Sequence, residues 1–209
     1  MRFAFFQPTD PDDSAFVENP AWRERPFTYT QGDENQSGGW KNDEWEREIK
    51  VSRADAATIF DQARARLINF DIIPPTIMNI TTQWNLEGRL PQQGDVIFQR
   101  THLIRIGNLH VVDVLSATRL GEVVDEADYF SLVYIATKGH PEKGFSRYSL
   151  HPNGEHRVIF KIETTSQPAN ILTKLVSPII TRRTQLKITH SVLDTMERGV
   201  IMDLSGVSS

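Results

Sequence analysis

The sequence predicts an α+β fold in which a curved antiparallel sheet of six or seven strands is covered by a long C-terminal helix. In the last long stretch, Gln167 to Arg198, apolar residues recur at helical spacings of three and four. In residues 76–164 the period changes to two, as in strands. Short turns separate these strands and no strand–helix alternation occurs, so we expect antiparallel pairing.

The composition is that of a globular protein without a bias toward nucleic acid. The chain has 209 residues, 39% of them hydrophobic and 24% charged, with a formal net charge of −4. This charge gives no general reason to bind nucleic acid or an anionic membrane. The chain has no cysteine, residues 1–6 are too short for a secretion signal, and no apolar run reaches the roughly 20 residues of a membrane helix. We therefore expect one soluble, cytoplasmic domain over residues 1–209, with no membrane insertion.

Residues 1–48 are expected to form an irregular, aromatic-rich segment that packs on the rest of the domain. They carry eleven acidic and five basic side chains. The aromatic residues among them are Trp22, Phe27, Tyr29, Trp40 and Trp45, a density that favours attachment to a core over disorder. Residues 27–30 are a candidate short strand, and residues 31–39 are predicted to be a loop.

An internal helix is predicted between Ser52 and Asn69. Ser52 is a candidate N-cap, and Asp55 adds negative charge to the first turn. One apolar face follows, formed by Ile59, Phe60, Ala63, Leu67 and Phe70. The helix must end before Pro74 and Pro75, because the residue before a proline is disfavoured in the helical conformation.

The strands are predicted from alternation and from the turns between them. The first begins at Thr76 and leads to Trp84, and the others are Asp95–Ile106, Leu109–Arg119, Tyr129–Thr137, Phe145–His151 and His156–Thr164. Gly107 and Asn108 form a two-residue hairpin signal, and Pro152 opens a tight turn. Gly121 is a candidate bulge, with Glu122 to Asp125 continuing the strand.

The terminal helix is expected to begin at Pro168 and to end before Gly199. Proline suits the first helical position because its missing N–H has no partner there, and glycine commonly follows a helix end. Pro178 should bend the helix, so that it follows the curved sheet and encloses a cavity. Residues 168–198 carry five basic and two acidic side chains. These charges form either a solvated face or a surface for the acidic N-terminal segment.

The segment from Tyr134 to Gly144 carries a resemblance to a known family. Its sequence, Tyr-Ile-Ala-Thr-Lys-Gly-His-Pro-Glu-Lys-Gly, resembles the motif Tyr-Gly-Thr-x-x-Gly-His-Pro-Glu-x-Gly of an uncharacterised bacterial and plant domain-of-unknown-function family. That family looks related to the START and birch-pollen-allergen-like helix-grip superfamily. The stretches beginning at Val123, Phe160, Ser166 and Pro178 are similar to further parts of the family pattern. The resemblance implies a helix-grip fold.

Several positions depart from this family pattern. Ala136 replaces a motif glycine, Gln167 stands where arginine is usual, and Phe145 stands where an acid is expected. The family's Val-Gly-Ala-Thr is not visible, since Thr30-Gln-Gly-Asp occupies that region. The chain therefore resembles a divergent member.

His140 is the residue most suited to catalysis, if the protein is an enzyme. It lies between Gly139 and Pro141 with a carboxylate, Glu142, two residues on. It is either an acid–base group or ligand anchor at a cavity mouth, or a structural residue that holds the loop by hydrogen bonds while glycine and proline set its backbone.

Other constellations are weaker. With Gly107 and Asn108 as the turn, Arg105 pairs with His110 across the hairpin, and His102 pairs with Asp113. Two histidines do not provide the three or four convergent ligands of a metal site, and no phosphate-binding loop or serine-nucleophile motif occurs. We expect no metal and no cofactor.

Three functions are compatible with these residues. The first is noncatalytic binding of an apolar or amphipathic small molecule between sheet and C-terminal helix. The candidate ligand-binding residues are Trp84, Tyr134, Thr137, His140, Arg182 and Gln185, each of which also has a structural interpretation. The second, which the resemblance to the helix-grip superfamily implies, is an enzyme of the cyclase, dehydratase or hydrolase type found on this fold, with His140 as acid–base. The third is a protein–protein interaction module that uses the basic helix and the acidic N-terminal segment.

Overall fold

The computed structural model describes residues 2–7, 13–36, 38–106, 109–169 and 180–206. The described strands are β1 (Arg2–Gln7), β2 (Lys41–Lys50), β3 (Met78–Thr82), β4 (Val96–Ile106), β5 (Leu109–Asp125), β6 (Phe130–Ala136), β7 (Glu142–Pro152) and β8 (Arg157–Pro168). The described helices are α1 (Ser14–Glu18), α2 (Pro20–Arg23), α3 (Asp33–Gln36), α4 (Ala56–Asn69), α5 (Gln83–Leu86) and α7 (Ile180–Ser205). The strands form one antiparallel sheet in the order β2-β8-β7-β6-β5-β4-β3, and β1 pairs with β5. The predicted fold class is confirmed, with eight described strands where six or seven were expected.

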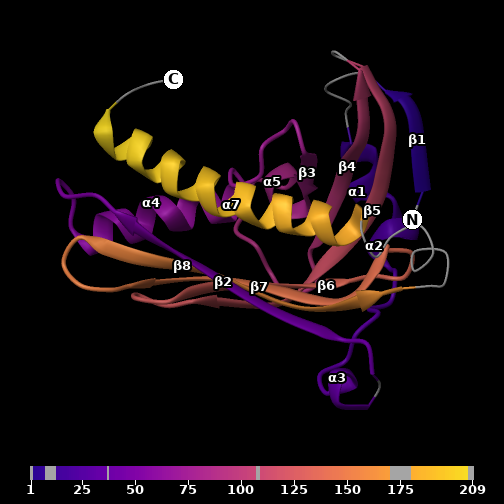
Figure 1. The fold of residues 1–209 in the computed structure, drawn as a ribbon, viewed down its shortest axis with the longest axis horizontal. Helices are drawn as coiled ribbons and strands as arrows, with labels where there is room; N and C mark the ends of the chain where they lie inside the picture. The colour runs from indigo at the N-terminus through magenta and orange to yellow at the C-terminus, as the bar shows by residue number, and fades with distance from the viewer. Residues whose placement is uncertain (1, 8–12, 37, 107–108, 170–179, 207–209) are drawn as a thin grey trace.

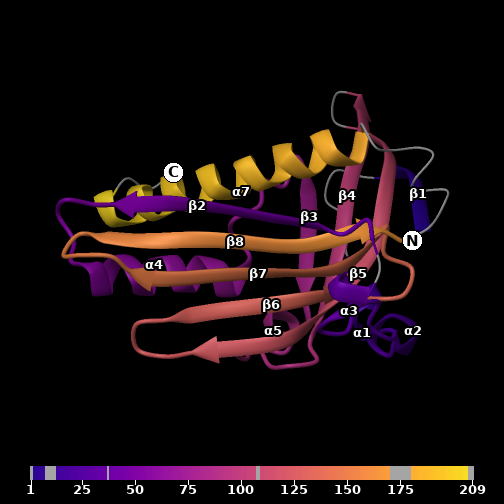
Figure 2. The same ribbon diagram turned by 60° about the horizontal axis from the view of Figure 1, so that its bottom comes forward.

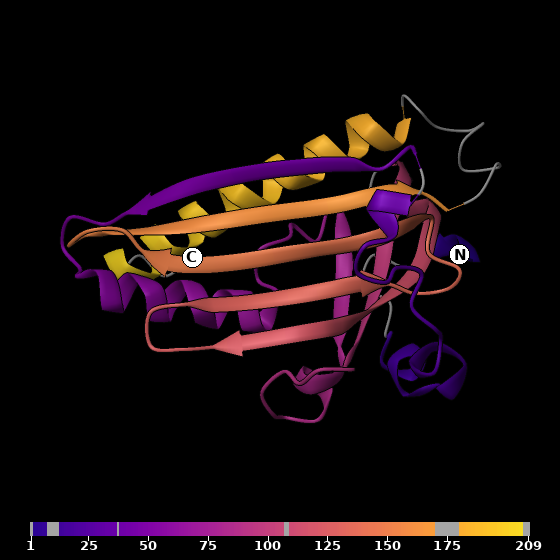
Figure 3. The same cartoon turned by 90° about the horizontal axis from the view of Figure 1, so that it is seen from below.

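The sheet curves around the long helix. In Figure 1, α4 and α7 lie on the same side of strands β2, β8, β7 and β6, and α3 lies on the opposite side. Strands β3, β4 and β1 cross that part of the sheet steeply (Figure 2). Seen from below, strands β2, β8, β7 and β6 lie in front of α4 and α7 (Figure 3). We call the helix-covered side of the sheet the inner face and the other side the outer face.

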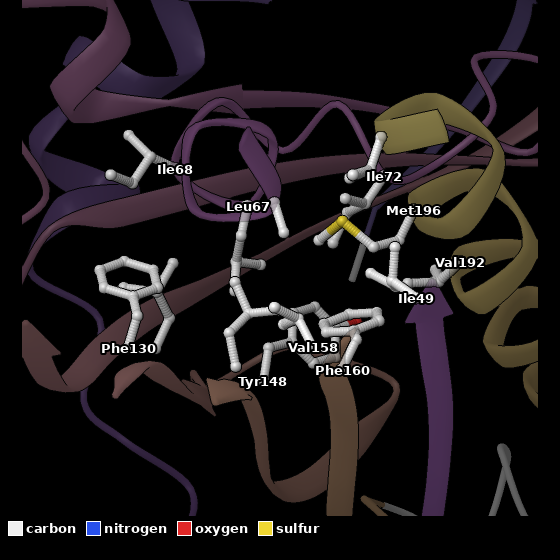
Figure 4. Packing of buried hydrophobic residues seen from close by; sticks show 14 of the residues in the cluster. Ile49, Leu67, Ile68, Ile72, Phe130, Tyr148, Val158, Phe160, Val192 and Met196 are labelled. Carbon is white, nitrogen blue, oxygen red and sulfur yellow. The ribbon is translucent and has the colours of Figure 1, made fainter. Parts of the chain in front are cut away.

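The main core lies between the inner face and the two helices. On the sheet side it contains Tyr148, Val158 and Phe160, and on the helix side it contains Leu67 of α4 and Met196 of α7, all of them buried (Figure 4). The apolar face predicted for residues 59–70 supplies five members of this core. Burial of this apolar surface is the main force that holds the helices on the sheet.

A second, smaller core lies on the other side of β4 and β5. It contains the buried residues Val17, Trp22, Val96, Phe98, Leu115 and Ala117. Beside it, the guanidinium group of Arg100 pairs with Asp13 and with Asp113, and His102 Nδ1 lies 2.9 Å from Asp113 Oδ1. The N-terminal segment is thus attached to the sheet by apolar packing and by a buried ionic network, and the predicted pairs of His102 with Asp113 and of Arg105 with His110 are confirmed.

The internal helix begins later than predicted. Its N-cap is Asp55, whose carboxylate accepts a hydrogen bond from the backbone N–H of Thr58 at 2.8 Å; Ser52 precedes the helix. Both residues are capping types, but only Asp55 lies one residue before the helical backbone begins. The predicted end at Asn69 is confirmed, and Phe70 follows it with a left-handed φ of 57°.

The boundaries predicted for the terminal helix are wrong at both ends. Pro168 is the last residue of β8, the described helix begins at Ile180, and it continues through Gly199 to Ser205. Pro178 lies outside the described residues. Gly199 lies inside α7 and does not end it. A Cβ there would lie 2.3 Å from the Arg66 guanidinium group, which crosses α7 at this point to reach Asp203.

The N-terminal segment contains two strands that alternation did not indicate. Residues 2–7 form β1 and residues 41–50 form β2, whereas the candidate strand at residues 27–30 is reduced to one bridge between Phe27 and Thr137. In the described contact between this segment and α7, the charges are reversed from the expected ones: the basic residue lies on the segment and the acidic residues lie on α7. Arg47 of β2 donates to Asp194 and Glu197 of α7, both at 2.8 Å.

Strand β5 confirms the predicted bulge. Its register with β6 shifts between Leu120 and Glu122, with Gly121 as the extra residue. A Cβ on Gly121 would lie 2.5 Å from the Ile135 side chain. The strand continues to Asp125, so one long strand joins the β4 part of the sheet to the β6 part.

Candidate functional site

Polar side chains gather at one end of the inner face, away from α4. Asp43, Thr164, Ser146 and Tyr134 occupy neighbouring register positions on β2, β8, β7 and β6. They face the helix side because core residues lie two positions away on the same strands, as Tyr148 does from Ser146. We call these four residues, together with Glu142, Gln99, Ser116 and His140, the polar end.

This row of the sheet is more exposed than the next one. Asp43, Thr164, Ser146 and Tyr134 are all partly exposed. In the adjacent row, Ile162, Tyr148 and Leu132 are buried at 5% exposure or less, and Trp45 on the outermost strand is partly exposed. On β8, β7 and β6 the inner face therefore changes from a buried apolar core to partly exposed polar side chains within one register step.

Tyr134 of the polar end contacts Tyr148, a buried core residue of the adjacent row. The hydroxyl oxygens of Tyr134 and Tyr148 lie 2.9 Å apart, and the two rings meet edge to face. Burial raises the pKa of both phenols, and the charge of Glu142 raises that of Tyr134 further. Both groups thus remain neutral hydrogen-bond donors at physiological pH. Beside them, the hydroxyls of Ser146 and Thr164 lie 3.0 Å apart.

The loop that carries His140 is held by backbone contacts. Lys138 N donates to Pro26 O at 2.9 Å, His140 N donates to Thr137 O at 2.9 Å, and Ala169 N donates to Pro141 O at 3.0 Å. Gly139 adopts a φ of 93°, which favours glycine at this turn. These contacts place the imidazole of His140 against the inner face.

The His140 ring is suited to a neutral structural role. Its Nδ1 lies 3.1 Å from the backbone N and 3.0 Å from the carbonyl oxygen of Glu142, and its Nε2 lies 3.4 Å from the Gln99 side-chain oxygen. Burial lowers the pKa of His140 to about 4, because desolvation disfavours the charged imidazolium. At neutral pH the ring is therefore uncharged.

Two other predicted site residues have structural contacts. Thr137 is fully buried, and its hydroxyl donates to Ala117 O at 2.7 Å. Trp84 lies in α5 rather than in a strand, is fully buried in the main core, and donates through Nε1 to Ile68 O at 2.8 Å. Neither residue contributes a polar atom to the polar end.

The remaining predicted residues lie at the start of the described part of α7. Arg182 and Gln185 belong to the first turns of α7, but their side chains are outside the described residues. Residues 170–179, which join β8 to α7, are outside them as well. The cavity between sheet and helix therefore remains a prediction, and so do these two ligand-binding assignments.

Sequence reasoning missed Gln99, Ser116, Ser146, Thr164 and Asp43. Gln99 and Ser116 are buried partners whose side chains lie 3.4 Å apart, and such residues in a strand resemble ordinary solvent-facing positions. The signal that could have found the others is alternation itself. Tyr148, Ile162 and Trp45 each identify an inner face, and the polar residue two positions away lies on that face.

An open hollow with a volume of about 380 Å³ lies beside the polar end and is lined by Asn42, Asp43, Glu44, Phe145, Arg147, Glu163, Thr164 and Thr165. Asp43 and Thr164 also belong to the polar end, so the hollow adjoins that site. Its charged side chains already form ion pairs, with Lys161 between Glu44 and Glu163 and with Arg147 beside Glu122. This pairing leaves little reason for a charged ligand to bind there.

Within the part of the chain that the structure describes, no group of three or more metal-ligating side chains converges. Over the same residues, no helix combines the length and apolarity needed to cross a membrane.

The curved antiparallel sheet, the long covering helix and the polar end on the inner face define a protein of the helix-grip class. The chain belongs to the family described as a domain of unknown function (DUF1990), which matches residues 27–195. A search of curated proteins found no match.

Solved structures share the fold at low sequence identity. Norcoclaurine synthase from Thalictrum flavum, in complex with dopamine and hydroxybenzaldehyde, is 15% identical over 87% of this chain and 96% of that chain, with a TM-score of 0.50. The di-domain ARO/CYC StfQ from the steffimycin biosynthetic pathway is 12% identical over 85% of this chain and 55% of that chain, with a TM-score of 0.52. The KanY protein is 13% identical over 78% of this chain and 98% of that chain, with a TM-score of 0.51. These similarities establish the fold and not an activity.

Proposed function

We propose that the protein binds an apolar or amphipathic small molecule between the inner face and α7, without catalysing a reaction on it. The observation that carries this proposal is the polar end, where partly exposed hydroxyl groups adjoin a sealed apolar core. Binding sites for small molecules combine an apolar lining with a few polar groups that orient the ligand. Tyr134, Ser146 and Thr164 are the groups assigned to that orienting role.

The state of His140 favours binding over catalysis. A general acid or base works best when its pKa lies near the working pH. With a pKa of about 4, His140 is almost never protonated at neutral pH and is a weak base. The ring nitrogens also lie against Glu142 and Gln99, which gives the ring a structural role in the loop.

The fold comparison supports small-molecule binding by analogy only, and it does not favour binding over catalysis. Norcoclaurine synthase, which shares the fold, was solved with dopamine and hydroxybenzaldehyde, and these are small molecules with an aromatic body and polar groups. We carry over from it only the expectation that a helix-grip protein can hold a molecule of this kind.

Native mass spectrometry of the protein purified from its own host tests the proposal. We expect a bound small molecule in the wild type and a lower bound fraction in Tyr134→Phe, which loses one hydroxyl of the polar end. The matched control is Tyr29→Phe, which removes a hydroxyl that donates to Glu34 at 2.7 Å and lies in an aromatic cluster with Trp40 and Phe145. Equal loss in both variants, or a wild type free of ligand, would contradict the proposal.

The enzyme alternative has its own test. If His140 acts as acid–base, His140→Ala should abolish turnover of any substrate found for the wild type. Turnover that is unchanged in this variant removes His140 from the chemistry.

A further inference from the structure

We propose that the hydroxyl group of Tyr148 donates a hydrogen bond to an acceptor oxygen of the bound molecule, such as the carbonyl oxygen of a ketone or an ester. This inference rests on the proposed function and adds a ligand-binding residue and the chemistry of the group that it recognises. It depends on the direction of a chain of hydroxyl hydrogen bonds that crosses three strands of the sheet.

Four hydroxyl groups form a continuous hydrogen-bonded chain on the inner face. The hydroxyls of Thr164 on β8 and Ser146 on β7 lie 3.0 Å apart. The Ser146 side chain also hydrogen-bonds the hydroxyl of Tyr134 on β6, which lies 2.9 Å from the hydroxyl of Tyr148. The chain thus runs from the partly exposed Thr164 to Tyr148, which is 5% exposed.

The contacts give this chain one direction. Tyr134 donates to Tyr148, so the single hydrogen of the Tyr134 hydroxyl is already used. The Tyr134 oxygen must then accept the hydrogen of Ser146, and Ser146 must accept the hydrogen of Thr164, because each hydroxyl has one hydrogen to donate. Three of the four hydrogens are therefore used within the chain, and the fourth is that of Tyr148.

The hydroxyl hydrogen of Tyr148 is buried in apolar surroundings. Among the residues that the structure describes, Tyr134 is its one hydrogen-bond partner, and Tyr134 is the donor of that bond. The Tyr148 ring belongs to the main core and lies 6.4 and 6.0 Å, between ring centroids, from Phe70 and Phe160. A buried donor without an acceptor is unfavourable. An acceptor atom of a ligand would gain this hydrogen bond without displacing a described partner.

The surroundings of Tyr148 favour an acceptor group that carries no polar hydrogen. A carbonyl or ether oxygen can accept the free hydrogen and brings no donor of its own into the apolar core. An alcohol can accept it too, but the alcohol hydrogen then needs an acceptor in the same surroundings. Tyr148 also lies in the row next to that of Tyr134 and Ser146, so the ligand oxygen would lie at the boundary between the polar end and the main core.

A ketone and its alkene analogue test the inference. Methyl octyl ketone and the hydrocarbon in which a methylene group replaces the carbonyl oxygen have nearly the same shape, but only the ketone accepts a hydrogen bond. Their affinities for the full chain can be compared at neutral pH by equilibrium dialysis, with the ligand quantified by gas chromatography. In Tyr148→Phe we expect the affinity for the ketone to fall roughly five- to tenfold, while the affinity for the alkene stays within about twofold of the wild type.

Two further variants separate Tyr148 from other tyrosines. Tyr134→Phe leaves the hydrogen of Tyr148 in place and removes only the group that donates to its oxygen, so it should weaken ketone binding by less than Tyr148→Phe does. The matched control, Tyr29→Phe, removes a hydroxyl whose ring packs against Phe145 on the outer face and should change neither affinity. Without ligand, Tyr148→Phe should be at least as stable to urea as Tyr134→Phe, because it removes the buried donor that lacks a described acceptor.

Each result decides between the claims. An alkene loss equal to the ketone loss in Tyr148→Phe, or a larger ketone loss in Tyr134→Phe, overturns the assignment to Tyr148 while leaving small-molecule binding intact. Lower stability of ligand-free Tyr148→Phe than of Tyr134→Phe overturns it too, since the hydrogen would then have an acceptor within the protein. If neither molecule binds, the inference is overturned, and the native mass spectrum of the wild type decides whether the proposed function fails with it.

Discussion

Replacing Arg100 by methionine should be among the most destabilising single changes in this protein. The side chains of Arg100, Asp13 and Asp113 are 3%, 1% and 0% exposed. Arg100 Nε donates to Asp13 at 2.9 Å, and Nη1 donates to Asp113 at 3.4 Å. Methionine fills most of the volume but removes the guanidinium group from two buried carboxylates, of which Asp113 keeps its contact with His102. Breaking a buried pair in this way costs about 3–5 kcal/mol, a large part of the roughly 5–15 kcal/mol that stabilises a typical domain.

Urea unfolding followed by tryptophan fluorescence measures this cost. Trp22 packs in the smaller core beside the network, so its emission also reports whether the N-terminal segment separates before the rest unfolds. The matched control is Arg157→Met, whose ion pair with Glu48 spans 3.4 Å between side chains that are 48% and 41% exposed. A pair of this kind contributes about 0–1 kcal/mol. A loss below about 1 kcal/mol in Arg100→Met, similar to the control, would refute the argument that the network is essential.

The remaining predictions concern pH and two glycines. The pKa of His140 is about 4 in the folded state and about 6.5 in the unfolded state, so the unfolded state binds the proton more readily. The free energy of unfolding is therefore unaffected by this histidine above about pH 6.5. It decreases as the pH falls toward about 4, by at most about 3 kcal/mol. Unfolding at pH 7 and pH 4.5 should therefore show a larger loss in the wild type than in His140→Gln, and equal losses would contradict the assignment. Gly144→Ala should cost about 3 kcal/mol or more, because φ is 128° and the new Cβ would lie 1.9 Å from the Thr165 carbonyl oxygen. Gly199→Ala should stay within about 1 kcal/mol of the wild type in the same assay, because the better helix propensity of alanine offsets displacement of the flexible Arg66 side chain; equal losses in the two alanine variants would disprove this distinction.

Local patterns in the sequence were sufficient where one physical effect dominates. The bulge at Gly121 was predictable because alternation resumes directly after the glycine, and the pairing of His102 with Asp113 followed from the length of the hairpin turn. The apolar face of α4 was predictable because its residues repeat at helical spacing. Each of these features depends on neighbours in the chain.

Features that depend on distant contacts were not predictable in the same way. The space that Gly199 leaves inside α7 is occupied by Arg66, a residue of another helix. The extension of β8 to Pro168 depends on its pairing with Glu142 of β7. The polar end depends on register across four strands, so Tyr134 was identified while Ser146 and Thr164 were not.

Strand β2 was not predicted because a charged residue interrupts the alternation of apolar and polar side chains along it. Trp45, Arg47 and Ile49 face the helices, and the residues that alternate with them, Glu44, Glu46 and Glu48, face outward. An arginine on the inner side breaks the simple apolar–polar alternation, although its charge is neutralised by α7. The strand pairs with β8 in a continuous register, and only the order of its apolar and polar side chains is irregular.

The same charges have a consequence for how copies of the protein meet one another. β2 stands at one end of the strand order, where a strand presents backbone groups that a second chain can use to extend the sheet. In the antiparallel register that places Glu46 opposite its counterpart, Glu44 of each copy would lie opposite Glu48 of the other, and repulsion between like charges disfavours that contact. The glutamates of β2 therefore disfavour this way of extending the sheet from one copy of the protein to another.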